Sequence, residues 1–322
     1  MKRKATLLLV AFLTLGAPWL TGQVRADTLR GGTPAGNNFT FLPLRIGVDR
    51  GVFAQHGLDI TVTDFGGGAK LQQGFVAGAV DIAVSAGTDM GFIAKGAPEL
   101  AVAAMGSKPV LGLVVPYDSP LKTVDDLKGK KVGVTTVGSL TEWLMKRLME
   151  QKHWPPNAVS LVPIGSELSN EIALVTAGQI DAVVAPPALG LQLEAQKHGR
   201  LLLKTIDPGA DFLGEAIFAS TALIKDHPDA VRRFLAAWFE NLNWMANHKA
   251  EVVERARAYT RFSPEIESDE YDLVMPIFSH DGRFHAAALK TLQQSFIDMG
   301  TLDHAPDMSK LYTEAYLPPA SQ

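Results

Sequence analysis

The chain contains one short phrase twice: Gly78-Ala79-Val80-Asp81-Ile82-Ala83-Val84 returns one hundred residues later as Gly178-Gln179-Ile180-Asp181-Ala182-Val183-Val184. Each copy has the pattern of a helix end, a glycine that stops the helix, an aspartate and a short buried β-strand. Because the two copies lie in different halves of the chain, the repeat predicts two similar α/β lobes.

The amino terminus has the three parts of an export signal. Lys2-Arg3-Lys4 is basic, residues 5–17 are apolar, and Val24-Arg25-Ala26 offers small residues for cleavage after Ala26. A membrane anchor is the alternative, but glycine and proline interrupt the apolar run, which falls short of the roughly 20 residues that span a bilayer. The chain has no cysteine and so no site for a lipid anchor. We therefore expect a periplasmic protein with residues 1–26 removed, and not a lipoprotein.

Charge and composition limit the partners. The chain has 30 basic and 34 acidic residues, and the basic residues are scattered, so nothing favours nucleic acid or an anionic membrane surface. The residues after Ala26 are enough for two lobes of ordinary size, and no second apolar segment is long enough for a membrane. A monomer that binds a small molecule is expected.

Strand candidates and helical patterns alternate from Leu29 to about Leu203, which is typical of parallel sheets covered by helices. The first half predicts strands over 28–32 and 59–62 and helices over 42–53 and 69–77. The second half predicts a strand at 131–134 and a helix over 140–151. From Leu223 onward the pattern is helical, with an amphipathic helix around Trp238 and further helices near 267–277 and 286–299.

The start of the 140–151 helix is a candidate anion site. Ser139 can serve as its N-cap, and Glu142 stands three residues on, as a capping box requires. The free N–H groups of the first turn, the helix dipole and the hydroxyls of Ser139 and Thr141 could receive a carboxylate or sulfonate. Plain capping explains the same residues equally well, so both interpretations stay open on the spacing alone.

Motifs for catalysis, metals and cofactors were sought. The sequence has no thiol nucleophile, no Gly-x-Ser-x-Gly elbow and no phosphate loop of the Walker type. The nearest approach to a metal cluster, His280-Asp281 with His285, is more typical of a solvated loop. Gly66-Gly67-Gly68 could cradle an oxyanion, but it lacks the dinucleotide-binding fingerprint, which favours a flexible turn. We expect no catalytic residues, no metal and no cofactor.

Four segments in order resemble a known family: Leu44-x-Ile-Gly-x-Asp-x-Gly-Val-Phe-Ala-Gln-His-Gly-Leu-Asp-Ile, the Gly-x-x-Asp-Ile-Ala phrase, Asp126-Leu127-Lys128-Gly129-Lys130-Lys131-Val132-Gly133-Val134, and Ile224-Lys225-x-x-Pro228-x-Ala-Val-x-x-Phe234. Together they are similar to the nitrate/sulfonate/taurine group of ABC-transporter substrate-binding proteins. This group also resembles proteins that handle the thiamine pyrimidine precursor. The similarity covers nearly the whole chain after Ala26.

The resemblance implies a type II periplasmic-binding fold. This fold has two α/β lobes with mostly parallel central sheets, two crossing strands that join them, a ligand cleft between them and a helical C-terminal region. The crossings are expected near Val110 to Val115 and near Ala216 to Ala219. Lobe one would then comprise residues 27–112 with 217–322, and lobe two residues 113–216.

The resemblance also implies where the ligand contacts lie, namely on the loops that follow strands and at the helix start of lobe two. In this sequence those positions are Asn37, Asn38, Phe39, Gly87, Thr88, Ser139, Thr141, Pro186 and Pro187, with Glu215 beside the second crossing. The family pattern favours ligand contact for Ser139 and Thr141. No basic anchor accompanies them, which favours an organic ligand with an anionic or polar end over a bare inorganic anion.

The function implied is a receptor of an ABC importer. It would capture a small, anionic organic solute such as a sulfonate or carboxylate by cleft closure and deliver it to a membrane permease driven by a cytoplasmic ATPase. One alternative is an enzyme that acts on a small heterocycle in the same cleft, although the fungal pyrimidine-synthesising relatives rely on a cysteine-rich motif that this chain lacks. Another is a periplasmic sensor subunit.

Overall fold

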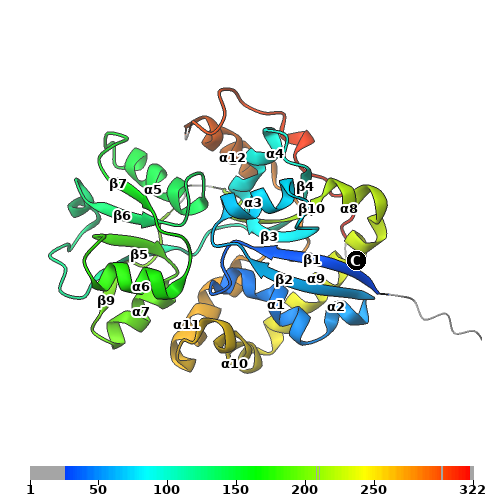
Figure 1. Cartoon of the computed structure of the whole chain (residues 1–322), viewed down its shortest axis with the longest axis horizontal. Coiled ribbons are helices and arrows are strands. Elements are labelled where there is room, and N and C mark those ends of the chain that lie inside the picture. Colours follow the sequence, from blue (N-terminus) through cyan, green and yellow to red (C-terminus); the bar gives the residue numbers. More distant parts are fainter. Residues whose placement is uncertain (1–25, 208, 210, 299, 320–322) are drawn as a thin grey trace, which may run out of the picture.

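The structure is a computed structural model that describes residues 26–319 except 208, 210 and 299. The predicted signal segment lies outside the described residues, apart from Ala26, so its cleavage stays a prediction. Within the described part of the chain, no helix is both long and apolar enough to cross a bilayer. Figure 1 shows two lobes side by side, each built on its own sheet.

The first sheet has the strand order β2-β1-β3-β10-β4. Its strands are β1 (Asp27–Thr33), β2 (Leu58–Asp64), β3 (Ile82–Ala86), β4 (Glu99–Gly106) and β10 (Glu215–Ser220). β1 pairs in parallel with β2 and β3, whereas β10 is antiparallel to both of its neighbours, β3 and β4. The sheet is therefore mixed, with one reversed strand.

The second sheet repeats this plan with the order β7-β6-β8-β5-β9. Its strands are β5 (Gly112–Pro116), β6 (Lys131–Val134), β7 (Ser160–Pro163), β8 (Ala182–Ala185) and β9 (Gly199–Leu203). Here β6 pairs in parallel with β7 and β8, and β5 is the reversed strand. The mostly parallel two-lobe arrangement predicted from the repeated phrase is confirmed.

The repeated phrase makes the same contacts in both lobes. Asp81 precedes β3, and its Oδ2 accepts a hydrogen bond from the N–H of Arg30 at 2.7 Å. Asp181 precedes β8, and its Oδ2 accepts one from the N–H of Lys131 at 2.8 Å. The glycines that open the two copies have φ angles of 65° and 63°, a left-handed conformation that glycine adopts without strain. Each phrase therefore ends a helix and aligns a central strand with its neighbour.

The chain changes sheets between β4 and β5 and again between β9 and β10. The predicted position of the second crossing was wrong, because Ala216 to Ala219 lie inside β10, hydrogen-bonded between β3 and β4 of the first sheet. The predicted first crossing also extends too far, since Gly112–Pro116 already pairs within the second sheet. A buried strand and a buried crossing segment are equally apolar, so sequence hydropathy does not separate them.

Helices cover both faces of each sheet (Figure 1). In lobe one the helices before the first crossing are α1 (Leu42–Asp49), α2 (Val52–Gln55), α3 (Gly68–Val76) and α4 (Met90–Ala94), with 3-10 turns at Phe39–Phe41 (η1) and Gly87–Asp89 (η2). The single helix predicted over 42–53 is divided at Gly51, whose φ is 70°. In lobe two the helices are α5 (Leu140–Gln151), α6 (Leu168–Thr176) and α7 (Pro187–Ala195), with a 3-10 turn at Val124–Leu127 (η3).

The C-terminal region is helical and packs mainly on lobe one. It contains α8 (Thr221–Asp226), α9 (Pro228–Asn247), α10 (Lys249–Thr260), α11 (Pro264–Val274) and α12 (Ala286–Asp298), with 3-10 turns at Met275–Ile277 (η4) and Met308–Lys310 (η5). The predicted apolar face of α9 is buried in the core beside α1 and α2. α10 was not predicted from the sequence, because it is rich in charged residues and has a weak apolar stripe.

The predicted capping box of α5 differs in one contact. The Oγ of Ser139 accepts a hydrogen bond from the N–H of Glu142 at 3.4 Å, as predicted. The carboxylate of Glu142 instead accepts from the N–H of Gly138 at 2.6 Å, one residue before the N-cap. The φ of Gly138 is 78°, which turns this N–H toward the helix start.

Candidate ligand-binding site

The two sheets face each other with the carboxyl ends of their parallel strands, where ligands bind in open α/β folds. The loops after β1, β2, β6, β7 and β8 and the end of β3 meet there and enclose a cavity of about 70 Å³. Both lobes contribute to its wall, and so does the first crossing through Val110 and Leu111. It is lined by Pro34, Ala35, Asn37, Asn38, Thr40, Phe41, Gly67, Gly68, Ser85, Ala86, Val110, Leu111, Thr135, Ser139, Leu140, Thr141, Ser166, Glu171, Val184, Pro186 and Glu215.

The lobes touch across this cavity. The Oγ of Ser166 in lobe two donates a hydrogen bond to the backbone oxygen of Pro34 in lobe one at 3.0 Å. Gly67 of lobe one lies against Thr136 of lobe two, so that a Cβ at position 67 would be 2.5 Å from Thr136 Cγ2. Only glycine fits this approach, since its φ of 136° is also unfavourable for other residues. The structure is therefore the closed arrangement of the two lobes.

Two buried carboxyl groups line the cavity, one from each lobe. Glu171 on α6 is 4% exposed and Glu215 on β10 is 2% exposed. Burial raises the pKa of each to about 8, and the charge of Glu167 adds to the shift of Glu171. Oε2 of Glu215 has no hydrogen-bond partner. An unpaired buried oxygen is energetically costly, so these groups are available to a ligand that donates hydrogen bonds.

The lining offers no cation to an anionic ligand. None of the described residues that line the cavity is lysine, arginine or histidine. A third carboxyl, Asp89, lies behind the wall, where its Oδ2 accepts hydrogen bonds from Ser85 Oγ at 2.5 Å and Gln72 Nε2 at 3.2 Å. The anionic ligand expected from the sequence stays a prediction, and the sequence gives no local signal for the acid that Glu171 adds to this wall.

The hydroxyls at the start of α5 are already paired with one another. Thr141 Oγ1 accepts a hydrogen bond from the N–H of Thr135 at 2.9 Å and lies 2.9 Å from Ser139 Oγ. Both side chains are buried, and Ser139 also caps the helix. The network shapes the loop between β6 and α5, while the same two hydroxyls remain on the cavity wall.

Six of the residues selected from the sequence lie together on this wall: Asn37, Asn38, Ser139, Thr141, Pro186 and Glu215. Four do not. Phe39 is buried against Tyr271 of α11, and Pro187 is the first residue of α7, behind the cavity wall. Gly87 packs on the second crossing, where a Cβ would be 2.2 Å from the oxygen of Leu213, and Thr88 is buried in η2. The position of these residues after strands identified the loops at the cavity. It did not indicate which side chains of each loop point into the cavity.

Several residues of the wall were missed. Gly67 and Gly68, interpreted as a flexible turn, bring the backbone of lobe one to the cavity. Thr135 and Ser166 are short polar residues in loops, and Glu171 follows Glu167 at the spacing of an exposed helix face. The apolar residues beside Glu171 in the sequence of α6 were the only signal that could have suggested its burial. Among the described residues, no group of three or more histidine, aspartate or glutamate side chains is placed to hold a metal ion.

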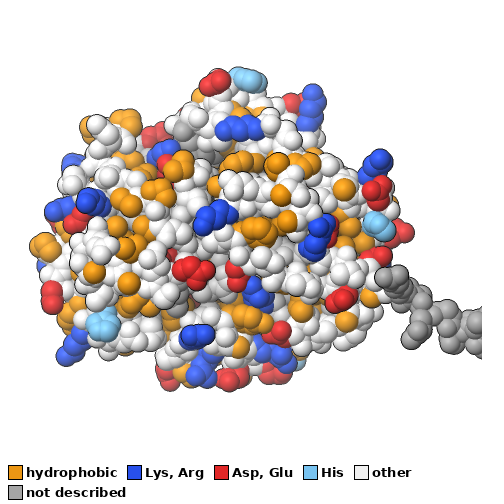
Figure 2. Space-filling model, in the orientation of Figure 1, with side chains coloured by type: hydrophobic (Ala, Val, Ile, Leu, Met, Phe, Trp, Pro, Cys, Tyr) orange, Lys and Arg blue, Asp and Glu red, His pale blue; other side chains and the backbone are white. Residues whose placement is uncertain are grey.

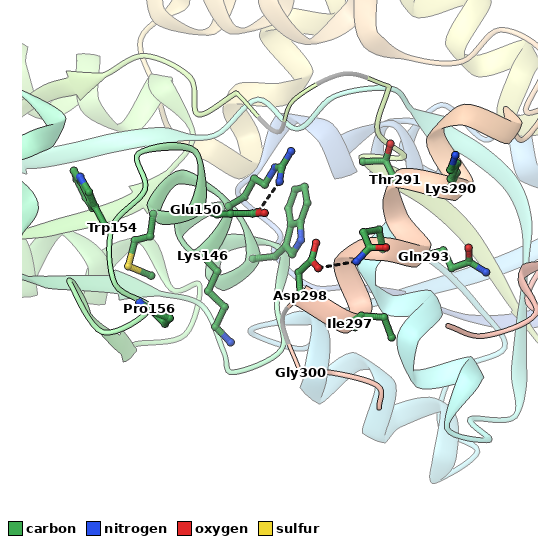
Figure 3. Close-up of a pocket in the computed structure, with 14 residues that line it drawn as sticks. Lys146, Glu150, Trp154, Pro156, Lys290, Thr291, Gln293, Ile297, Asp298 and Gly300 are labelled. Carbon is green, nitrogen blue, oxygen red and sulfur yellow. Dashed lines mark hydrogen bonds and ion pairs between the residues drawn. The ribbon is translucent and has the colours of Figure 1, made fainter. Parts of the chain in front are cut away.

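A larger hollow of about 950 Å³ lies outside the cavity, between α5 and α12 (Figure 3). Glu150 pairs with Arg147 of its own helix at 2.5 Å, and Asp298 accepts from Gln294 of its own helix at 2.8 Å. Trp143 is buried and stacks on Phe212, with ring centroids 4.1 Å apart. Gln293 of the same hollow donates to the backbone oxygen of Pro306 at 2.6 Å. These polar groups are paired with separate partners and do not converge on a common point, so we place the site in the smaller cavity.

Charged side chains elsewhere are dispersed. Figure 2 shows acidic and basic side chains interspersed over the visible face, with no continuous tract of either sign. The visible face therefore has no basic tract of the kind that attracts a polyanion.

Comparison with known proteins gives a consistent result. A family model described as NMT1/THI5 like matches residues 38–252. A Haemophilus influenzae protein whose name assigns it to thiamine biosynthesis is 32% identical over 136 residues, which are 42% of this chain and 42% of that protein. The yeast 4-amino-5-hydroxymethyl-2-methylpyrimidine phosphate synthase THI13 is 24% identical over 246 residues, 71% of this chain and 69% of the yeast protein.

Solved structures show the fold. The alkanesulfonate-binding protein SsuA from Xanthomonas axonopodis pv. citri, bound to MOPS, superposes with a TM-score of 0.75 at 19% identity. The match covers 90% of this chain and 99% of SsuA. At this identity the likeness establishes the type II periplasmic-binding fold, and it leaves the ligand to be argued from the cavity.

Proposed function

Because the chain belongs to the NMT1/THI5-like family and has the type II periplasmic-binding fold, we propose that it is a periplasmic solute receptor of an ABC importer. The ligand enters the open cleft, contacts both lobes and favours the closed form by binding it more tightly than the open form. The closed receptor then delivers the ligand to a membrane permease driven by a cytoplasmic ATPase. The observation that carries this proposal is the cavity lined by both lobes at their strand ends.

The two cavity carboxyls point to a ligand that donates N–H groups and is neutral or cationic. A carboxyl with a pKa of about 8 keeps its proton at pH 7, so it can donate to a ring nitrogen and accept from an adjacent amino group. An aminopyrimidine presents that pair of groups. The names of the Haemophilus and yeast relatives, which refer to thiamine biosynthesis and to an aminopyrimidine, support this ligand class.

A thermal-unfolding panel tests the ligand class. The protein that begins at Asp27 is heated with 4-amino-5-hydroxymethyl-2-methylpyrimidine, other aminopyrimidines, alkanesulfonates, carboxylates and nitrate. A compound at about a thousand times its Kd adds roughly 4 kcal/mol, which shifts the Tm by several degrees in a protein of this size. We expect the shift with aminopyrimidines. A shift confined to sulfonates or carboxylates would contradict the role given to the two carboxyls.

The enzyme alternative has one observation in its favour, the synthase activity in the name of the yeast relative. Mass spectrometry of the bound compound separates the two functions. A receptor returns its ligand unchanged and in a ratio of one to one, whereas an enzyme accumulates product over many turnovers.

The hydroxyls of Ser139 and Thr141 give a second test. The variant S139A/T141V is expected to lose about 2 kcal/mol of unfolding free energy in urea, since it removes a helix cap and a buried hydrogen bond. It should also bind the compound selected by the panel at least roughly tenfold more weakly, because these hydroxyls lie on the cavity wall.

The matched control is S220A, at the N-cap of α8. Ser220 Oγ accepts from the N–H of Leu223 at 3.1 Å and is not part of the cavity wall. This variant should lose about 1 kcal/mol of stability and keep its affinity. Equal affinities for wild type and S139A/T141V would restrict Ser139 and Thr141 to capping.

A further inference from the structure

Helix α11 belongs to the cores of both lobes. Two residues before its start, Phe262 is 4% exposed and packs in lobe two with Leu189 and Leu193 of α7, and Ile266 of its first turn packs against the same cluster. At its end, Tyr271 and Val274 are buried in lobe one. In Figure 1, α11 lies below α6 and α7 at the junction of the lobes. Separation of the lobes must therefore break the contacts on one half of this helix.

A carboxyl of α11 faces a helix of the opposite lobe, since α11 packs on α7. The backbone N–H of Ala188, in the first turn of α7, lies where it favours the charged form of Glu270 and opposes the rise in pKa caused by burial. That turn has no side-chain cap of its own, because its N-cap residue is Pro186. The side chain of Glu270 is 2% exposed, and its Oε1 has no hydrogen-bond partner. A carboxyl at the positive end of the α7 dipole is favourably placed.

The next residue supports the cavity from the other lobe. The ring of Tyr271 meets Phe39 edge to face, with centroids 6.1 Å apart and an angle of 88°. Its hydroxyl donates to the backbone oxygen of Met245 at 2.8 Å, which fixes the ring. Phe39 directly follows Asn38, which lines the cavity in lobe one. Ala188 lies two residues after Pro186, which lines it in lobe two. One turn of α11 therefore supports a cavity loop of each lobe from the side away from the cavity.

We propose that Glu270 is a positioning residue that latches the two lobes closed and sets the loop at Pro186 for the ligand. The proposal rests on the receptor function proposed above, since closure matters only if the cavity binds a solute. Glu270 does not line the cavity, so it acts through α7 and not by touching the ligand.

The groups around Glu270 define the control variants. Glu267, one turn earlier on α11, adds negative charge, and Lys204, after β9, adds positive charge. Burial, with the charge of Glu267, raises the pKa of Glu270 to about 8, so the group carries a proton at pH 7. Glutamine reproduces this state, so E270Q should keep the latch and E270L should lose it.

Glu267 offers a matched control on the same helix. It is fully buried, and its Oε2 accepts from Thr260 Oγ1 at 2.8 Å within the C-terminal region. E267L therefore removes a buried carboxyl of α11 whose hydrogen bond to Thr260 stays within the C-terminal region.

The experiment measures lobe separation without any ligand. Because the chain has no cysteine, E150C and K290C supply unique spin-label sites on α5 and α12, on opposite sides of the hollow in Figure 3. Electron resonance gives the distance between the labels, and small-angle scattering of unlabelled protein gives the radius of gyration. E270L should shift the distance distribution and enlarge the radius, whereas E270Q and E267L should match wild type.

Affinity for 4-amino-5-hydroxymethyl-2-methylpyrimidine should fall roughly tenfold in E270L and stay unchanged in E270Q, as loss of one buried polar contact across a closing interface predicts. If E270L does not fold, F262A replaces it, with the same shift expected. A wild-type distance distribution in E270L, or in F262A where it replaces E270L, overturns the latch. Failure of wild type to bind any compound while E270L still opens overturns only the proposed ligand function.

Discussion

The variant E171L/E215L is expected to lose at least roughly a hundredfold in affinity and yet to be more stable than wild type at pH 8. Each leucine leaves a polar group of the bound ligand without a hydrogen-bond partner in the cavity, which costs about 1–3 kcal/mol, so two such losses multiply to roughly that factor. Stability should rise because each buried carboxyl is close to half ionised at pH 8, and leucine removes the cost of a buried charge. Calorimetric titration with the panel compound and thermal unfolding measure the two effects.

The expected loss of affinity together with a gain in stability makes the test specific to a binding site. A damaged core would lose both stability and affinity, whereas a site that retains costly polar groups for a ligand gains stability when they are removed. The control is E99L. Glu99 is also buried, with both oxygens unpaired, but it begins β4 and does not line the cavity. It should become more stable with unchanged affinity, and equal affinities in all three proteins would remove the carboxyls from the site.

The second large effect is on the pH dependence of folding. The free energy of unfolding of the ligand-free protein should fall between pH 5.5 and pH 8.5. Glu99 by itself should account for about 4 kcal/mol of that fall. Burial, with the nearby charge of Asp89, raises the pKa of Glu99 to about 9 in the folded protein, against an ordinary value of 4.5. Over this range the folded state holds a proton that the unfolded state has released.

The sign follows from that proton. Stability changes with pH by the number of protons bound in the unfolded state minus the number bound in the folded state, and this difference is negative here. Stability is therefore greatest below the unfolded pKa and decreases until the pH passes about 9. Glu171, Glu215 and Glu270 act in the same direction, but opening of the lobes can return them to solvent, whereas Glu99 is enclosed in lobe one.

Urea unfolding at a series of pH values measures this slope. The variant E99Q lacks the titrating group and should lose about 1.4 kcal/mol per pH unit of the dependence. E270Q serves as a control for the lobe junction and should leave the contribution of Glu99 in place. A stability that rises from pH 5.5 to pH 8.5 would contradict the burial of these acids.

The sequence specified the architecture because its signals are local. The glycines and aspartates of the repeated phrase form a helix stop and a strand alignment within a few residues, and the same contacts appear at Asp81 and Asp181. The helix over Leu140–Gln151 was predicted at both ends from its cap and periodicity. The order of the motifs along the chain then indicated the family and the fold.

The crossings, the inward-facing side chains and the charge of the cavity depended on the tertiary structure. Val110 and Ala216 are equally apolar, yet one lies in a connection and the other in a central strand. Phe39 and Asn38 are adjacent, but only Asn38 lines the cavity, because Tyr271 of a distant helix receives the ring of Phe39. Glu171 has the local pattern of an exposed helix residue but is buried on the wall of the cavity between the lobes. Local patterns determine where helices, strands and loops form, whereas burial and charge environment are properties of packing between segments far apart in the chain.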